Sequence, residues 1–193
     1  MSQSKTHTVQ FRRKRRGETN YKKRLRILLS SKLRLVIRKS LNNITAQIVE
    51  YNEKGDKVLL AVSSKSLDKY GWKANKGNLP SAYLVGLLIG KKAKSKGLDN
   101  LVLDMGFNKS VKGSRIFAVL KGIIDIGINI PYSKEIFPNE DRINGSHISK
   151  YAESLKQSSN FEKIFSDYIK NNIDPLKLTE YFKKTKNKIM EAS

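Results

Sequence analysis

Hydrophobic and polar residues alternate along three short stretches in the first third of the chain, at 33–39, 44–51 and 58–63. Polar segments rich in Asn, Asp and Gly separate them, and these residue types favour turns. Because successive side chains of a strand point to opposite faces of a sheet, the pattern predicts an antiparallel meander with one apolar face. An ordinary solvated face is the alternative interpretation of the polar positions on the other side. Those positions include Arg34, Arg38 and Gln47.

The middle of the chain changes to helical periodicity. From residue 78 to residue 97, small apolar residues recur at helical spacing, Pro80 stands in the first turn and Gly97 is a natural stop. The small residues would let this helix sit close to the sheet. Residues 101–104 are interpreted as a short buried strand, and residues 114–126 as a second amphipathic helix. This order predicts an α/β fold in which helices pack on one face of a mixed sheet, the meander plus a further strand.

The two ends of the chain differ from this core. Residues 1–16 lack apolar periodicity and are expected to be extended or disordered in isolation, whereas residues 21–30 fit a short helix with one basic and one apolar face. Residues 130–145 contain two prolines and a glycine and are interpreted as a surface connection. Two helices are predicted after it, at about 159–171 and 175–190, the second with Asp174 as its N-cap.

The chain therefore divides into three predicted parts. These are a basic arm with a short helix (1–30), an α/β core domain (31–130), and a connecting loop with a C-terminal helical extension (131–193).

Charge is concentrated near the N-terminus. The 193 residues include 39 Lys or Arg and 17 Asp or Glu, which gives a net charge of +22. Residues 1–39 hold 14 basic residues and one acidic residue, so more than half of the excess lies in the first fifth of the chain. A basic arm on a milder domain is typical of nucleic-acid binding. A solvated tail or a nuclear-localisation signal is the alternative, but the basic run continues directly into a predicted strand, which favours RNA or DNA.

Other functional classes are disfavoured. The absence of cysteine excludes a disulfide framework and fits a cytoplasmic protein, and no apolar run is long enough to span a bilayer. His7 and His147 have no partner at metal-ligand spacing. Asp104, at a strand end, is a single carboxylate and is interpreted as a cap of the following loop. Residues 86–92 resemble a phosphate loop only superficially, because the glycine spacing is one residue short and no strand precedes it. We therefore expect neither an enzyme nor a bound cofactor or metal.

Two loops are candidate binding elements. Residues 106–115 place Lys109, Lys112 and Arg115 beside the predicted N-terminus of a helix, where free N–H groups suit a phosphate. Simple capping of that helix is an equally good interpretation. The Tyr70-Gly71-Trp72-Lys73 segment lies among lysines, so its aromatic rings suit stacking on RNA. The alternative is that the single Trp fills the core.

Five stretches of the chain resemble one protein family. They are RLVIRKSLNNITAQ (34–47), YGWK (70–73), NLPSAYLVGLLIGKK (78–92), LDMGFNKSVKGSRIFAVLKG (103–122) and IPYSKEIFPNEDRINGSHI (130–148). The family is that of large-subunit ribosomal protein eighteen in its archaeal and eukaryotic form, whose eukaryotic members are also called ribosomal protein five. The last stretch is similar to the archaeal or eukaryotic branch, because bacterial members end soon after the second helix; an archaeal protein is expected.

The resemblance implies a structural role without catalysis. Members of the family bind 5S rRNA and seat it in the central protuberance of the large ribosomal subunit, beside 23S rRNA and neighbouring ribosomal proteins. Membership would place the chain in the cytoplasm, on the ribosome, and not as a homo-oligomer. The residues expected to contact RNA are Arg12, Arg13, Lys14, Arg15, Arg16, Tyr21, Lys22, Lys23, Arg24, Arg26, Arg34, Arg38, Lys39, Asn42, Asn43, Gln47, Lys69, Tyr70, Trp72, Lys73, Lys109, Lys112 and Arg115.

Two other functions are alternatives to RNA binding. A DNA-binding or chromatin-type protein predicts a recognition helix with base-reading residues or a dimer seam, and the sequence offers neither. An enzyme of nucleic-acid metabolism would need several convergent acids, which the chain lacks.

Overall fold

A four-stranded mixed sheet forms the centre of the protein. The computed structural model describes residues 8–158 and 160–192. The strands are β1 (Leu33–Lys39), β2 (Ile44–Glu50), β3 (Lys57–Ser63) and β4 (Leu101–Asp104). Their order in the sheet is β3-β2-β1-β4. Strand β2 pairs antiparallel with both β1 and β3, and β4 pairs parallel with β1. The predicted meander with one further strand is therefore confirmed.

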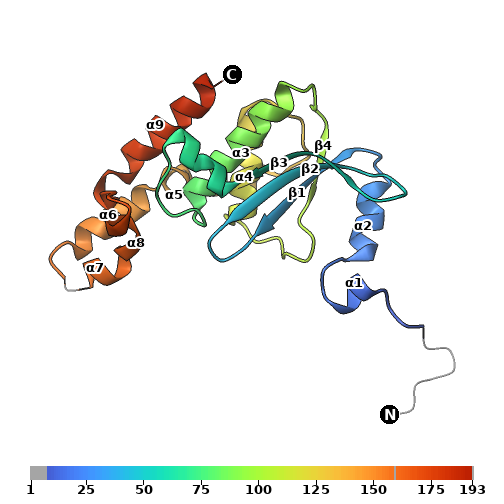
Figure 1. Ribbon diagram of the computed structural model, residues 1–193, viewed down its shortest axis with the longest axis horizontal. Helices are drawn as coiled ribbons and strands as arrows, with labels where there is room; N and C mark the ends of the chain where they lie inside the picture. The colour runs from blue at the N-terminus through green and yellow to red at the C-terminus, as the bar shows by residue number, and fades with distance from the viewer. Residues whose placement is uncertain (1–7, 159, 193) are drawn as a thin grey trace, which may run out of the picture.

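Two helices, α3 (Leu79–Lys94) and α4 (Arg115–Asp125), cover one face of this sheet (Figure 1). The side chain of Asn78 caps α3 by accepting a hydrogen bond from the N–H of Ser81. At the other end, Gly97 has a φ of +67° and the N–H of Leu98 bonds to the carbonyl of Ala93. This bond satisfies the carbonyl of Ala93 in the last turn of the helix, so Gly97 ends the helix as predicted.

The sequence predicts that the small residues of α3 let this helix sit close to the sheet. In the structure, they also let it sit close to α4. A Cβ atom added to Gly86 would lie 2.1 Å from the carbonyl oxygen of Val119. One added to Gly122 would lie 2.4 Å from that of Tyr83. The two helices therefore cross with their backbones in contact, and both glycines are required by this close approach.

The C-terminal part adds short helices that join the same core. They are η2 (Lys134–Ile136), α5 (Glu140–Ile143), α6 (Ser146–Leu155), α7 (Phe161–Ile164), α8 (Ser166–Lys170), η3 (Pro175–Lys177) and α9 (Leu178–Glu191). The last predicted helix is confirmed, and the Asp174 side chain accepts from the N–H of Leu176. Phe182 of α9 packs 5.8 Å from Tyr83 of α3, measured between ring centroids.

Two predictions for this part were wrong. The helix α6 was missed, because its start depends on Gly145 at a φ of +82° and not on a polar N-cap side chain. The helix predicted at 159–171 is two helices that meet at Phe165, whose backbone leaves helical geometry while its ring is buried at 3% exposure. Residue 159 lies outside the described residues.

The N-terminal arm projects from the opposite end of the molecule to the C-terminal helices (Figure 1). Its helix α2 (Tyr21–Leu28) is confirmed and is capped by the side chain of Asn20. The prediction of an extended arm was wrong for α1 (Arg12–Arg15), which is a single helical turn. Residues 1–7 of the predicted arm, including His7, lie outside the described residues.

Candidate nucleic-acid interface

The basic run of the arm is fully presented to solvent. All five residues from Arg12 to Arg16 are exposed, and α1 buries no residue. Arg13 is oriented by Thr19, whose hydroxyl oxygen accepts from Nε at 2.9 Å, and by Glu18 at 3.4 Å. Five neighbouring cations on one turn repel one another, so this surface is suited to a polyanion that neutralises them.

A groove of about 280 Å³ separates the arm from the sheet face that α3 and α4 leave uncovered. One wall comes from residues of the arm, including Arg13, Lys23 and Arg24. The floor comes from the strands and the turns that follow them. The floor residues include Arg34, Arg38, Gln47, Asp56, Asp104 and Gly106.

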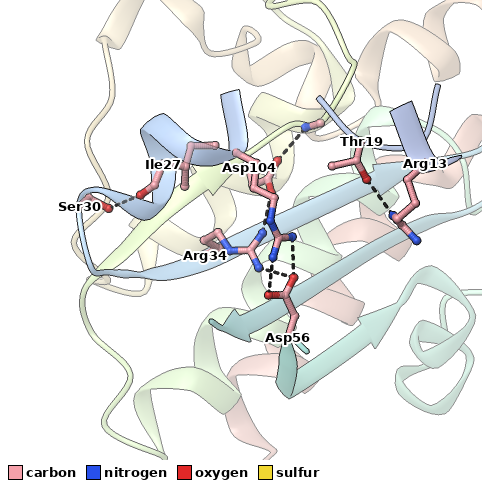
Figure 2. Close-up of polar contacts among 9 residues, drawn as sticks. Arg13, Thr19, Ile27, Ser30, Arg34, Asp56 and Asp104 are labelled. Atoms are coloured by element: carbon pink, nitrogen blue, oxygen red, sulfur yellow. Dashed lines mark hydrogen bonds and ion pairs between the residues drawn. The ribbon is translucent and has the colours of Figure 1, made fainter. Parts of the chain in front are cut away.

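Arg34 forms the buried part of this groove, and the prediction that it points outward from an open sheet face was wrong. Its side chain is only 3% exposed. Figure 2 shows its guanidinium between two carboxylates, with Nη2 2.6 Å from Asp56 and Nη1 3.2 Å from Asp104. Strand alternation correctly turns Arg34 away from the apolar core, but the arm and the β2–β3 turn cover this end of the sheet. Arg34 therefore stabilises the fold from within, because its charge is compensated by the two acids.

Arg24 connects α2 to the same carboxylate, Asp56. Its two terminal nitrogens each donate to one oxygen of Asp56, at 2.8 Å. Burial by itself would raise the pKa of Asp56, but the hydrogen bonds from Arg24 and the adjacent positive charge of Arg34 outweigh it and hold that pKa below its ordinary value. The carboxylate stays charged at neutral pH, so the contact persists there.

Arg38, four residues further along β1, remains exposed as predicted. Its guanidinium lies against the backbone of Gly106, where an added Cβ would be 2.4 Å from Nη1. Gly106 has a φ of +57° and donates its N–H to Asp104 at 2.9 Å. Asp104 therefore holds the loop after β4, which is the capping role expected for it. The same loop lies against the Arg38 guanidinium, and both line the groove.

The arginine at the start of α4, Arg115, is half-buried and bonds to the protein backbone. Nη1 of Arg115 donates to the carbonyl oxygens of Gly77 at 2.7 Å and Ser40 at 3.2 Å. Arg115 therefore ties the start of α4 to the β1–β2 turn and to the segment before α3, and it does not stand open as the predicted phosphate site required. Lys109 is exposed, and the exposed Lys112 lies 3.2 Å from Glu135.

Trp72 is a core residue, so the prediction that it stacks on RNA was wrong. It is 1% exposed, and its ring lies edge-on to Phe182 of α9 with centroids 6.5 Å apart. Its Nε1 donates to the carbonyl of Asn75 at 3.2 Å, which fixes the 72–75 loop. Tyr70 is half-buried, and the neighbouring Lys69 and Lys73 are exposed.

The remaining predicted residues divide between two ends of the molecule. Lys22, Lys23 and Arg26 are exposed on α2, where Tyr21 is half-buried. At the far end of β1, Lys39 and Asn42 are exposed and Asn43 is half-buried. Asn42 and Asn43 line a second groove together with Asp167, Lys170, Asn171 and Asn172. The sequence pattern did not predict that these four residues belong to a site. These segments lie more than one hundred residues apart, and no local pattern marks them as neighbours.

Two features of the described residues concern other classes of site. Within residues 8–158 and 160–192, His, Asp and Glu side chains do not gather in a group of three that could hold a metal ion. In the same part of the chain, every helix is too short or too polar to cross a membrane.

The chain is similar in sequence to one known family over more than half of its length. The family model is described as ribosomal large subunit proteins 60S L5 and 50S L18. It matches residues 5–101 and 92–133, which include the arm, the whole sheet, α3 and α4.

Proposed function

Because the chain belongs to the family of ribosomal large-subunit proteins 60S L5 and 50S L18, we propose that it binds 5S rRNA and anchors it in the central protuberance against 23S rRNA. Membership makes the chain an rRNA-binding structural constituent of the large ribosomal subunit, a non-enzymatic kind of protein. The identity of the RNA and the place of binding are the content of the proposal.

The exposed basic run of α1, beside a groove with Arg38 at its mouth, is the observation that carries the proposal. Cations on the arm would neutralise phosphates and release counterions, which supplies affinity without reading sequence. Arg38 is held on a strand and against a turn, so it would contact RNA from a fixed position and report on RNA shape. The arm would thus supply most of the affinity, and the sheet would orient the bound RNA.

A competition assay tests the proposal. The purified chain is titrated with labelled 5S rRNA at fixed salt, with unlabelled duplex DNA, an unrelated structured RNA or 5S rRNA as competitor. We expect only 5S rRNA to compete at low concentration, because duplex DNA offers the arm phosphates but not the shape that fits the groove. Equal competition by all three nucleic acids would contradict the proposal.

A further inference from the structure

A second groove, with a different chemistry, lies where β1 ends, away from the arm. Its volume is about 740 Å³. Amide side chains are its most frequent lining, and we call it the amide groove after them. They are Asn42 and Asn43 of the β1–β2 turn, Asn75, and Asn171 and Asn172 after α8.

Charge in the amide groove is nearly balanced. Three lysines, Lys73, Lys76 and Lys170, line it together with Asp68 and Asp167. One lysine is already paired, since Nζ of Lys76 lies 2.6 Å from Asp68. The five basic residues from Arg12 to Arg16 have a single acid beside them, Glu18 at Arg13, so the two surfaces suit different parts of a polyanion. An amide both donates and accepts hydrogen bonds, as the edges of nucleobases do.

An aromatic surface continues the amide groove. A neighbouring pocket of about 320 Å³ shares Lys73, Asn171 and Asn172 with it and adds Gly71 and Tyr181 of α9. Tyr181 is half-buried and lines this pocket. Aromatic rings beside lysines and amides are the components with which proteins bind unpaired RNA bases.

The walls of the amide groove are held in place by core residues. Trp72, bonded to the Asn75 carbonyl and packed on Phe182, fixes the wall formed by residues 72–75. Tyr168 of α8 is buried, and its hydroxyl accepts from the side chain of Asn78 at 3.5 Å. A preformed site loses little conformational entropy on binding, which favours recognition of a flexible ligand.

We infer that the amide groove binds an unpaired stretch of RNA. Its bases are read by the asparagine amides and stack on Tyr181, while Lys73 and Lys170 contact the flanking phosphates. The inference rests on the proposed function, since it assumes an RNA-bound protein, and it adds a second RNA surface built by the C-terminal helices. The protein would then hold RNA at both ends of its sheet.

The test uses the full chain and two probes of equal length, an unstructured RNA of about ten nucleotides and its duplex. Tyr181→Leu removes the stacking ring, and Tyr181→Phe keeps it. Asn172 has a φ of +54°, so Asn172→Gly removes an amide while retaining a backbone that glycine adopts readily. Asn187→Ala, at an exposed asparagine of α9 outside the groove, is the matched control.

We expect Tyr181→Leu to weaken binding of the unstructured RNA by about tenfold, because one stacked base contributes roughly that much. Tyr181→Phe and Asn187→Ala should bind as the wild type does. Asn172→Gly should weaken binding of the unstructured RNA and leave the duplex unaffected. Thermal melting of each variant confirms that it is folded.

Three results would overturn the inference. They are unchanged binding of the unstructured RNA by Tyr181→Leu and Asn172→Gly, equal losses for both probes, and equal losses for the Leu and Phe variants. Unchanged binding by both variants would indicate that a protein segment, and not RNA, occupies the groove. Wild-type binding of 5S rRNA is measured alongside, and its absence would overturn the proposed function independently of the groove variants.

Discussion

Arg24 and Asp56, 32 residues apart in sequence, form a two-pronged ion pair in which both hydrogen bonds measure 2.8 Å. Asp56 also contacts the buried Arg34 at 2.6 Å, so one carboxylate joins an arm helix to the centre of the sheet. The apolar residues Leu25 of α2 and Leu29, the C-cap of that helix, are 63% and 77% exposed. Because α2 buries so little apolar surface, this polar contact is what holds it against the sheet.

Replacing Asp56 by Asn should release α2 and lower the free energy of unfolding by about 2 kcal/mol, because Arg34 then keeps only Asp104 as a counter-ion. Hydrogen exchange should show faster exchange of the α2 amides, and denaturant titration should show the loss of stability. Glu135→Gln is the control, since its pair with Lys112 is exposed at both partners and contributes little. Unchanged exchange in α2 would show that another contact holds the helix.

The same contact should weaken in acid. The pKa of Asp56 is below its ordinary value of 3.8 in the folded protein, because the hydrogen bonds from Arg24 and the adjacent charge of Arg34 outweigh the effect of burial. A lowered folded-state pKa adds stability that is complete above the unfolded value and is lost as the pH falls through the folded value. The stability difference between wild type and Asp56→Asn should therefore be constant from neutral pH to about pH 5 and shrink below about pH 4. A difference that grows on acidification would contradict the assignment.

Arg34 and Arg38 should respond differently to the same substitution. Arg34→Gln should lower the free energy of unfolding by about 3–5 kcal/mol, since it leaves the buried Asp104 without its counter-ion. Arg38→Gln should leave stability unchanged and lower affinity for 5S rRNA more than affinity for an unrelated structured RNA. Denaturant titration and one competition assay at fixed salt measure both effects. Equal losses of affinity for the two RNAs would show that Arg38 supplies charge but no selectivity.

Binding of 5S rRNA should depend steeply on salt. If six to ten phosphates are contacted, log affinity should fall against log salt with a slope of roughly −4 to −9. Replacing the five basic residues from Arg12 to Arg16 by Gln should make the slope shallower by about 3 to 4, without changing the melting temperature. Deleting residues 1–16 should have the same two effects, because the helical turn within it buries no residue. A large loss of thermal stability would instead show that the arm is structural.

Trp72→Ala should lower the free energy of unfolding by about 3–5 kcal/mol, because it opens a cavity beside Phe182 in the core. At a temperature where the variant is still folded, its affinity for 5S rRNA through the arm should be retained. Fluorescence-independent measures such as circular dichroism and filter binding are needed, since the chain has a single Trp. Full stability with lost RNA affinity would restore the interpretation of Trp72 as a stacking residue.

Much of the fold could be predicted from local patterns. Residues 33–39, 44–50 and 57–63 form the expected strands because alternation reflects side-chain direction within each strand. Asn78, Pro80 and Gly97 marked the ends of α3 because capping depends on a few neighbouring residues. The start of α6 escaped prediction because it depends on the positive φ of Gly145, which lies next to Leu178 and Pro80 in the folded chain.

The sequence by itself determined the basic arm, the strand order along the chain and the family, because charge, periodicity and motif are properties of neighbouring residues. It could not separate Arg34 from Arg38, which occupy equivalent positions in the same alternating strand. The tertiary structure decided that Arg34 is buried between Asp56 and Asp104 while Arg38 stays in solvent. It also placed Trp72 in the core and Tyr181 beside Lys73. The physical reason is that exposure depends on which distant segment covers a side chain, and the strand carries no signal of that segment.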